Sequence, residues 1–442
     1  MKGFVVLFAL FSLNLFAANI AIIDSGVDYK HTDLLQNLWI NPNEVLDRRD
    51  NDGNGYQDDI HGWNFAESKP EVIDYKFLGT FSPDVKTFFT IQGKIMMNQA
   101  SSDDIAWYKE KAKDQKFMSE LSKFGNFVHG THVAGIAAKE SNAMILAAKL
   151  IPTEVKPFVE ARIKNMDKEN NREKIMAALF KALAVQQMNL LEEIGFYINE
   201  KQASIANGSF GTGFKQAKMI TDIVFRIVHF RKPTEEESDK TARMFLSAVL
   251  EQGSRMLNAA PKTLFVFAAG NDGTNNDVYP TSPTNIKAEN TISVAATYER
   301  EFLAPFSNYG VEMVDVAAPG MLIDSAIPGN DHLKVSGTSQ AAPYVANIAG
   351  QIKDANPALK PSEIKELLMR TVDKKGFLVG KVKSGGVVNP ERAVLAAQLS
   401  KTLSLNEAVE RASLSVQDYA SRGIKLENVQ LVTPIPMYPL YQ

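Results

Sequence analysis

The segment Val335–Pro343 reads VSGTSQAAP. It places Ser339 after a Gly-Thr pair and directly before a pattern that predicts a helix over Gln340–Ala355. Small neighbours leave a serine hydroxyl accessible, and the unpaired N–H groups of a first helical turn can stabilise negative charge. The segment therefore indicates an exposed nucleophile at a helix N-terminus. The alternative is that Thr338 or Ser339 only caps the helix.

Upstream of this segment, short apolar runs alternate with helical patterns, which predicts an α/β fold: a mostly parallel sheet with helices on both faces. In such sheets, functional sites gather at the carboxyl ends of the strands. The predicted strands are Asn19–Asp24, Met144–Leu150, Ala203–Ser209, Thr263–Ala268, Thr291–Ala295 and Met313–Ala317. The predicted helices include Glu173–Ile194, Lys215–Phe230, Thr241–Asn258 and Pro361–Thr371, the last with Ser362 as its N-cap.

A histidine begins a second informative segment, VHGTHVAGIAA at 128–138. We expect His129 at the start of a helix whose small residues let it press against the sheet. The imidazole would then point toward the strand ends. His129 and His132 could instead bind a metal, but no acid or cysteine stands at the spacing of a zinc site.

Two further segments place polar side chains at predicted strand ends. Asp24 ends the strand in IIDSGVD at 22–28, where a carboxylate can orient a histidine. Asn271 follows a strand in AAGN at 268–271, where an amide can donate to a developing oxyanion. The alternatives are turn-forming roles for both residues.

Together these motifs resemble the subtilisin-like serine peptidases, over roughly 19–397. Subtilisin itself has the same order of acid, histidine and serine. The resemblance implies the three-layer subtilisin-like fold, with Ser339 as nucleophile, His129 as general base and Asp24 as the orienting carboxylate. It implies that Asn271 stabilises the oxyanion. It also assigns His132 no catalytic part.

The segment NGSFG at 207–211 resembles the family strand that pairs with an extended substrate. The resemblance thus implies protein or peptide substrates, bound through Ser209, Phe210 and Gly211 by main-chain hydrogen bonds. Gln340 and Thr32 depart from the family pattern, which usually has Met and Pro there. Neither departure removes a residue of the triad or the oxyanion site.

The domain organisation is predicted from the N-terminal residues and from the segments that do not fit the alternation of strands and helices. Lys2, an apolar run and Ala17-Ala18 are typical of an export signal, which predicts a secreted or periplasmic protein without a stable membrane anchor. The alternative is an uncleaved anchor. The predicted parts are a signal peptide over 1–17, a catalytic domain over 18–398 with a helical insertion over 81–123, an exposed charged loop over 231–240, and a helical and Pro-rich tail over 399–442.

Composition excludes several classes of chemistry. The 442 residues include no cysteine, so disulfides, zinc–thiolate sites and a thiol nucleophile are excluded. The formal net charge is −3, with no basic field that would favour nucleic acid as a partner. The oligomeric state stays open.

An acidic loop, DNDGNGYQDD at 50–59, predicts structural calcium, although no cofactor is expected in catalysis. Asp50, Asp52, Asn54 and Asp58 fall at calcium-loop positions 1, 3, 5 and 9, and Tyr56 would give its carbonyl. Position 12 is His61 instead of a bidentate glutamate, so the match is partial. The alternative is a surface loop held by Asx turns.

A catalytically silent binding protein and a metal-dependent hydrolase are the alternatives to an active endopeptidase. One feature favours the binding protein. Secreted members of the family typically have a pro-domain between the signal peptide and the catalytic domain, whereas here the predicted signal leads almost directly into the Asp24 strand. A metal-dependent hydrolase lacks a ligand set. Since every triad residue is kept, the sequence favours the active peptidase.

Overall fold

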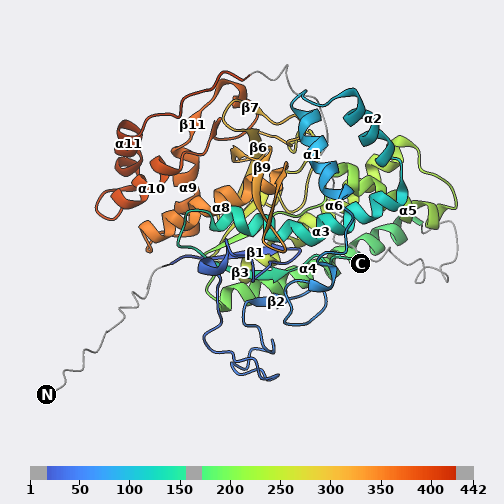
Figure 1. The fold of residues 1–442 in the computed structure, drawn as a ribbon, viewed down its shortest axis with the longest axis horizontal. Coiled ribbons are helices and arrows are strands. Elements are labelled where there is room, and N and C mark those ends of the chain that lie inside the picture. The colour runs from blue at the N-terminus through green and yellow to red at the C-terminus, as the bar shows by residue number, and fades with distance from the viewer. Residues whose placement is uncertain (1–16, 156–171, 425–442) are drawn as a thin grey trace.

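The computed structural model describes residues 17–155 and 172–424 (Figure 1). The predicted signal peptide, apart from residue 17, and the last part of the predicted tail, 425–442, lie outside these ranges. Within them, no helix has the length and apolar character needed to cross a membrane.

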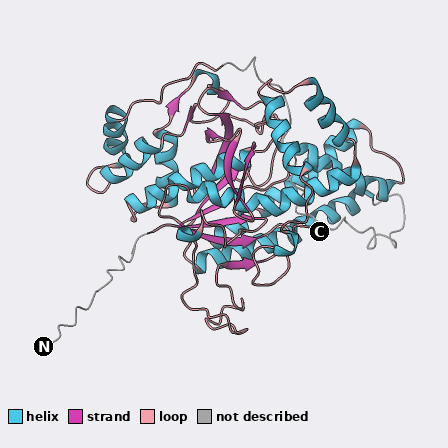
Figure 2. Cartoon of the chain, viewed as in Figure 1, coloured by secondary structure: helices cyan, strands magenta, loops and turns pink. Residues whose placement is uncertain are grey.

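A ten-stranded sheet forms the centre of the molecule (Figure 2). Its order is β11-β12-β8-β6-β5-β4-β1-β3-β2, with β7 paired to β6. The pairs β11–β12 and β6–β7 are antiparallel and the others parallel. The separate hairpin β9–β10 is antiparallel. The strands are β1 (Asn19–Asp24), β2 (Gly62–Asn64), β3 (Met144–Lys149), β4 (Ile205–Gly208), β5 (Leu264–Ala268), β6 (Thr291–Tyr298), β7 (Phe302–Leu303), β8 (Val316–Pro319), β9 (Ile323–Ile327), β10 (Asp331–Val335), β11 (Asp373–Lys374) and β12 (Gly386–Val387).

Helices cover both faces of the sheet, which confirms the three-layer α/β prediction. Along β1, Ile20 and Ile22 enter the core shared with α3 and α8, whereas Ala21 and Ile23 enter the core shared with α4 to α7. This alternation is the period of a strand buried on both faces. The helices are α1 (Asp84–Met96), α2 (Ser102–Lys111), α3 (Gln115–Ala138), α4 (Arg172–Glu200), α5 (Phe214–His229), α6 (Glu235–Gln252), α7 (Ser254–Ala259), α8 (Thr338–Ala355), α9 (Pro361–Arg370), α10 (Pro390–Leu399) and α11 (Leu405–Ser415), with 3-10 turns at η1 (Leu35–Asn37), η2 (Tyr75–Phe77) and η5 (Gly376–Leu378).

Three local predictions were wrong at helix N-termini. The charged segment 231–240 is a loop only in part, because Thr234 and Glu237 form a capping box that starts α6. Ser362 is not a cap, since Pro361 takes the first helical position of α9 and Lys360 precedes it as N-cap. His129 does not start a helix but lies in the middle of α3.

His129 lies in the middle of α3 because the predicted insertion is helical and continues into the histidine segment without a break. Residues 81–123 hold α1, α2 and the first turns of α3. These helices share an aromatic core with the β9–β10 hairpin, and in this core Phe88 stacks on Tyr108 at 4.2 Å between ring centroids. Asp114 caps α3 by accepting from the N–H groups of Lys116 and Phe117. The insertion therefore extends the histidine helix toward its N-terminus.

Candidate active site

Two glycines that are far apart in the sequence, Gly26 and Gly130, let α3 approach the end of β1 closely. A Cβ on Gly130 would lie 2.2 Å from the carbonyl oxygen of Gly26, so only glycine permits this approach. The N–H of Gly130 also donates to Ser25 Oγ at 3.0 Å. His129 is consequently held over the carboxyl end of β1, as its small neighbours predict.

Asp24 and His129 form a buried acid–histidine pair. Nδ1 of His129 lies 2.7 Å from Asp24 Oδ1, and Asp24 is fully buried. The same oxygen accepts from the N–H of Ser25 at 2.7 Å. A carboxylate on Nδ1 fixes the tautomer that leaves Nε2 free to accept a proton.

Ser339 lies in the first turn of α8, on the same cleft as His129. Its hydroxyl donates to the carbonyl of Ser209 at 3.2 Å, and Ser209 Oγ donates to the carbonyl of Ser339 at 2.9 Å. The hydroxyl must therefore turn from Ser209 to His129 before it can be deprotonated. Such catalytic hydrogen bonds often form only when substrate binds.

The amide of Asn271 is oriented by the turn that precedes Ser339. Its Oδ1 accepts from the N–H and the hydroxyl of Thr338, at 2.9 and 3.0 Å. The point where a Cβ on Gly337 would stand is 3.5 Å from Asn271 Nδ2 and 3.6 Å from the backbone nitrogen of Ser339, and Gln340 Oε1 also faces it at 2.7 Å. Two donors thus border one space, which is the arrangement that stabilises an oxyanion.

His129, Asn271 and Ser339 line a cleft of about 380 Å³, whereas Asp24 is buried beneath His129. Ser209, Phe210 and Gly211, the predicted substrate segment, lie on it directly after β4. His132 also touches the cleft but is buried, with Nε2 donating to the carbonyl of Leu333 at 2.9 Å. Burial lowers the pKa of His132 to about 4, so its ring is neutral and serves packing.

The cleft wall also includes residues that no motif in the sequence indicated. Phe89 and Gln92 of α1 and Met219 of α5 line it, as does Asp272 next to Asn271. Burial raises the pKa of Asp272, an effect that Lys215 opposes. The position of Asp272 directly after the oxyanion motif is a signal that could have found it. The other three come from helices whose placement no local pattern gives.

Comparison with known proteins gives the family. The model of the subtilase family matches residues 17–391. The chain belongs to this family. Subtilisin-like protease 1 of Plasmodium vivax is 27% identical over 393 residues, which are 86% of this subtilase and 48% of that protein. The cell wall-associated protease of Bacillus subtilis (strain 168) is 40% identical over 114 residues, 26% and 12% of the two chains.

Other relatives match shorter parts. Subtilisin BL of Lederbergia lenta is 34% identical over 149 residues, 33% of this subtilase and 51% of that protein. The subtilase thus spans about half the length, or less, of these curated relatives. Among solved structures, a lanthipeptide protease aligns at 16% identity with a TM-score of 0.47, covering 88% of this chain and 91% of that one.

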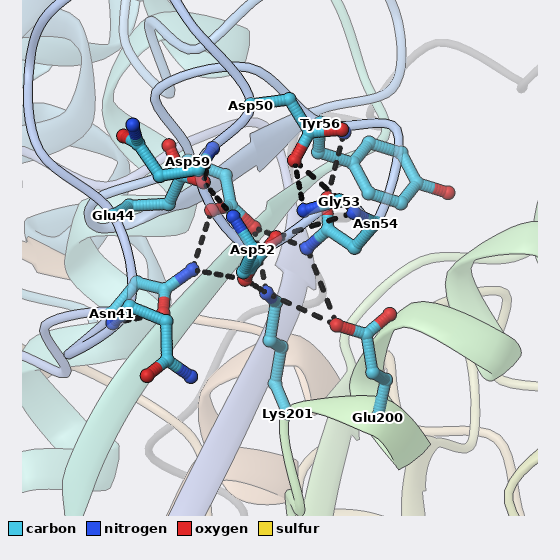
Figure 3. Close-up of polar contacts among 12 residues, drawn as sticks. Asn41, Glu44, Asp50, Asp52, Gly53, Asn54, Tyr56, Asp59, Glu200 and Lys201 are labelled. Carbon is cyan, nitrogen blue, oxygen red and sulfur yellow. Dashed lines mark hydrogen bonds and ion pairs between the residues drawn. The ribbon is translucent and has the colours of Figure 1, made fainter.

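The carboxylates of Asp50, Asp52 and Asp58, three of the predicted calcium ligands of the subtilase, do not gather at one point, and Figure 3 shows the contacts that Asp50 and Asp52 make instead. The carboxylate of Asp50 accepts from the N–H groups of Gly53 and Gly55, both at 2.7 Å. Asp58 accepts from the N–H groups of residues 47 and 48, and Asn54 Oδ1 from that of Tyr56. The Asn54–Tyr56 contact is an Asx turn, as in the alternative interpretation, whereas Asp58 holds a segment ten residues earlier in the chain.

A different acidic group lies at the base of this loop. Glu44, Asp52 and Asp59 bring carboxylate oxygens within 4.8 Å of one another. The ammonium of Lys201 lies 2.8 Å from Asp52 and 3.1 Å from Asp59, and its side chain is 5% exposed. A lysine is thus paired with Asp52, one of the five predicted calcium ligands. Calcium binding itself stays a prediction.

Proposed function

We propose that this subtilase is a secreted or periplasmic serine endopeptidase. One observation carries the proposal: His129, which is paired with the buried Asp24, borders a single cleft together with Ser339 and Asn271. Export is inferred from the N-terminal residue pattern. A binding protein without activity would have no need of Asn271 oriented toward the space beside Ser339.

Acylation would begin at the serine. His129 takes the hydroxyl proton on Nε2 as Ser339 Oγ attacks the carbonyl carbon of the peptide bond. Asp24 stabilises the resulting imidazolium through Nδ1–H. The oxyanion accepts from Asn271 Nδ2 and from the N–H of Ser339.

Cleavage and deacylation would use the same groups. His129 returns its proton to the leaving amine, which frees the first product and leaves an ester on Ser339. Water then attacks this ester, with His129 again as base, and the acid product leaves as Ser339 regains its proton. The chemistry is balanced without a cofactor.

Substrate would bind as an extended chain along Ser209–Gly211, held by main-chain hydrogen bonds. The wall of the cleft includes Phe89 and Gln92 of the insertion. We infer that the insertion narrows access, so that flexible chains are cleaved faster than folded proteins.

The test is cleavage of an unfolded protein, with internal fragments identified by mass spectrometry. The full chain is expected to produce fragments from internal bonds, and Ser339→Ala to produce none. Ser362→Ala on α9, which lies outside the cleft lining, is the matched control and should retain full activity. Equal cleavage by wild type and Ser339→Ala would refute the proposal.

A further inference from the structure

Two histidines and an aspartate meet outside the catalytic cleft. His31 and Asp33 follow β1, and His332 lies on β10, about three hundred residues later in the chain. One potential ligand atom from each lies within 4.8 Å of the other two. His332 Nε2 is 2.8 Å from Asp33 Oδ2, and the two imidazole rings meet edge to face at 5.5 Å.

The His31 ring is fixed in a definite tautomer. Its Nε2 lies 3.1 Å from the carbonyl oxygen of Asp331, which can only accept, so Nε2 carries the proton. Nδ1 therefore holds the lone pair, and it faces the N–H of Asp33 at 3.2 Å. A metal-binding histidine typically donates its other N–H to a carbonyl in this way, which sets the ring orientation.

The backbone around the three residues is held in place by other contacts. The N–H of Thr32 donates to Asn330 Oδ1 at 2.8 Å, joining the loop after β1 to the β9–β10 turn. Asp28 accepts from the N–H of Gly329 at 2.9 Å in the same way. Lys86 pairs with the carboxylate of Asp331, so that acid is already neutralised.

Two of the three candidate ligands are accessible from solvent. His31 is buried, but the side chains of Asp33 and His332 are 51% and 46% exposed. The ion pair of Asp33 is with His332, a residue that is itself a candidate ligand. The acidic group at Lys201 differs in this respect, because a lysine that cannot bind a metal sits inside it (Figure 3).

We propose that His31 Nδ1, Asp33 and a ring nitrogen of His332 bind a divalent transition-metal ion, with zinc as the best match. Two imidazoles and one carboxylate suit zinc, and water would complete the coordination. Binding replaces two hydrogen bonds with metal bonds: the one between Asp33 and His332, and the one that His31 Nδ1 accepts from the N–H of Asp33. Because β10 leads directly into α8, the ion would tie the loop after the Asp24 strand to the segment that carries Ser339.

The experiment uses the full chain carrying Ser339→Ala, so that autolysis does not interfere. Zinc chloride is titrated by calorimetry after chelation and dialysis, and thermal unfolding is followed with zinc, with magnesium and with chelator. One zinc ion per chain and a higher melting temperature with zinc alone are expected. The absence of saturable zinc binding would overturn the proposal, whatever the outcome for peptidase activity.

Variants locate the ion. His332→Ala and Asp33→Asn alter exposed side chains, so the fold should survive, and each should weaken zinc binding about tenfold or more. His229→Gln removes a histidine elsewhere and should leave binding unchanged. Cobalt bound to the parent chain should give the visible absorption of a low-coordinate site, absent in His332→Ala. Zinc affinity equal in His332→Ala and the parent chain would show that the ion lies elsewhere and would refute the site.

Discussion

Ser209 and Ser339 exchange two hydrogen bonds across the floor of the cleft. The Ser339 hydroxyl donates to the Ser209 carbonyl at 3.2 Å, and the Ser209 hydroxyl donates to the Ser339 carbonyl at 2.9 Å. Ser209 Oγ also accepts from Asn207 Nδ2 at 2.9 Å. The nucleophile helix is thereby fixed to the end of β4, where the substrate backbone is proposed to lie.

Asn271→Ala should lower kcat with little change in KM. The Thr338 contacts hold the amide toward the space where an oxyanion develops, and that charge exists only in the transition state. In subtilisin, loss of the oxyanion asparagine costs roughly 10²–10³ in kcat, and we expect a loss of that order. Steady-state kinetics on one peptide decides this, and an effect confined to KM would argue against the assignment.

Met219→Glu should raise KM for peptides with apolar side chains. Met219 is 62% exposed yet lines the cleft, so a charge there disfavours apolar substrate groups. Its exposure should keep the stability change within about 0.5 kcal/mol. Ile223→Glu, one helical turn further along α5 and outside the cleft lining, is the control. Equal KM changes in both variants would mean that Met219 does not meet substrate.

Acid should destabilise the fold through His132. Burial lowers its folded pKa from 6.5 to about 4, so the unfolded chain binds the proton first as pH falls. Titration of His132 therefore leaves the free energy of unfolding unchanged above about pH 6.5. Between about pH 6.5 and pH 4 it lowers the free energy of unfolding by roughly 3 kcal/mol. Chemical unfolding of Ser339→Ala across this range, in chelator, should show the slope.

The double variant Ser339→Ala/His132→Gln supplies the comparison, because glutamine does not titrate. It is expected to be less stable at neutral pH but to show a flatter pH dependence. Identical slopes with and without His132 would assign the acid sensitivity to other groups.

Lys201→Met should destabilise the acidic group and make the protein responsive to calcium. Bonds to Asp52 and Asp59 outweigh the desolvation of Lys201 and raise its pKa, while burial raises the pKa of Asp59. Removing one member of a buried ion pair costs about 3–5 kcal/mol. Melting temperatures in the Ser339→Ala background should fall with Lys201→Met and recover in part with calcium.

Lys174→Met, on the helix α4 that ends directly before Lys201, lacks the Asp52 contact and controls for loss of a lysine. If calcium raises the melting temperature of the parent chain as much as that of Lys201→Met, the loop binds calcium without competition from the ammonium. If neither responds, the calcium prediction for this loop is wrong.

The predictable part of the site lay in contiguous motifs. Asp24, His129, Asn271 and Ser339 each stand in a short segment with its own chemistry, and the apolar runs gave the strands of the sheet. Contacts between residues far apart in the sequence could not be predicted from such motifs. Lys201 meets Asp52 149 positions away, and His332 meets Asp33 across 299, so no local pattern reports either contact. The N-terminal part of α3 was not predicted to belong to the histidine helix, because its first turns are polar and were assigned to the insertion.

The central claim, that Ser339 is an activated nucleophile, is tested most directly with a fluorophosphonate probe. The folded wild-type chain should be labelled on one residue, identified as Ser339 by peptide mass spectrometry. Labelling should disappear in Ser339→Ala and become much slower in His129→Ala, both checked for folding by circular dichroism. A folded wild-type chain that takes no label, or a label on another residue that persists in Ser339→Ala, would contradict the account.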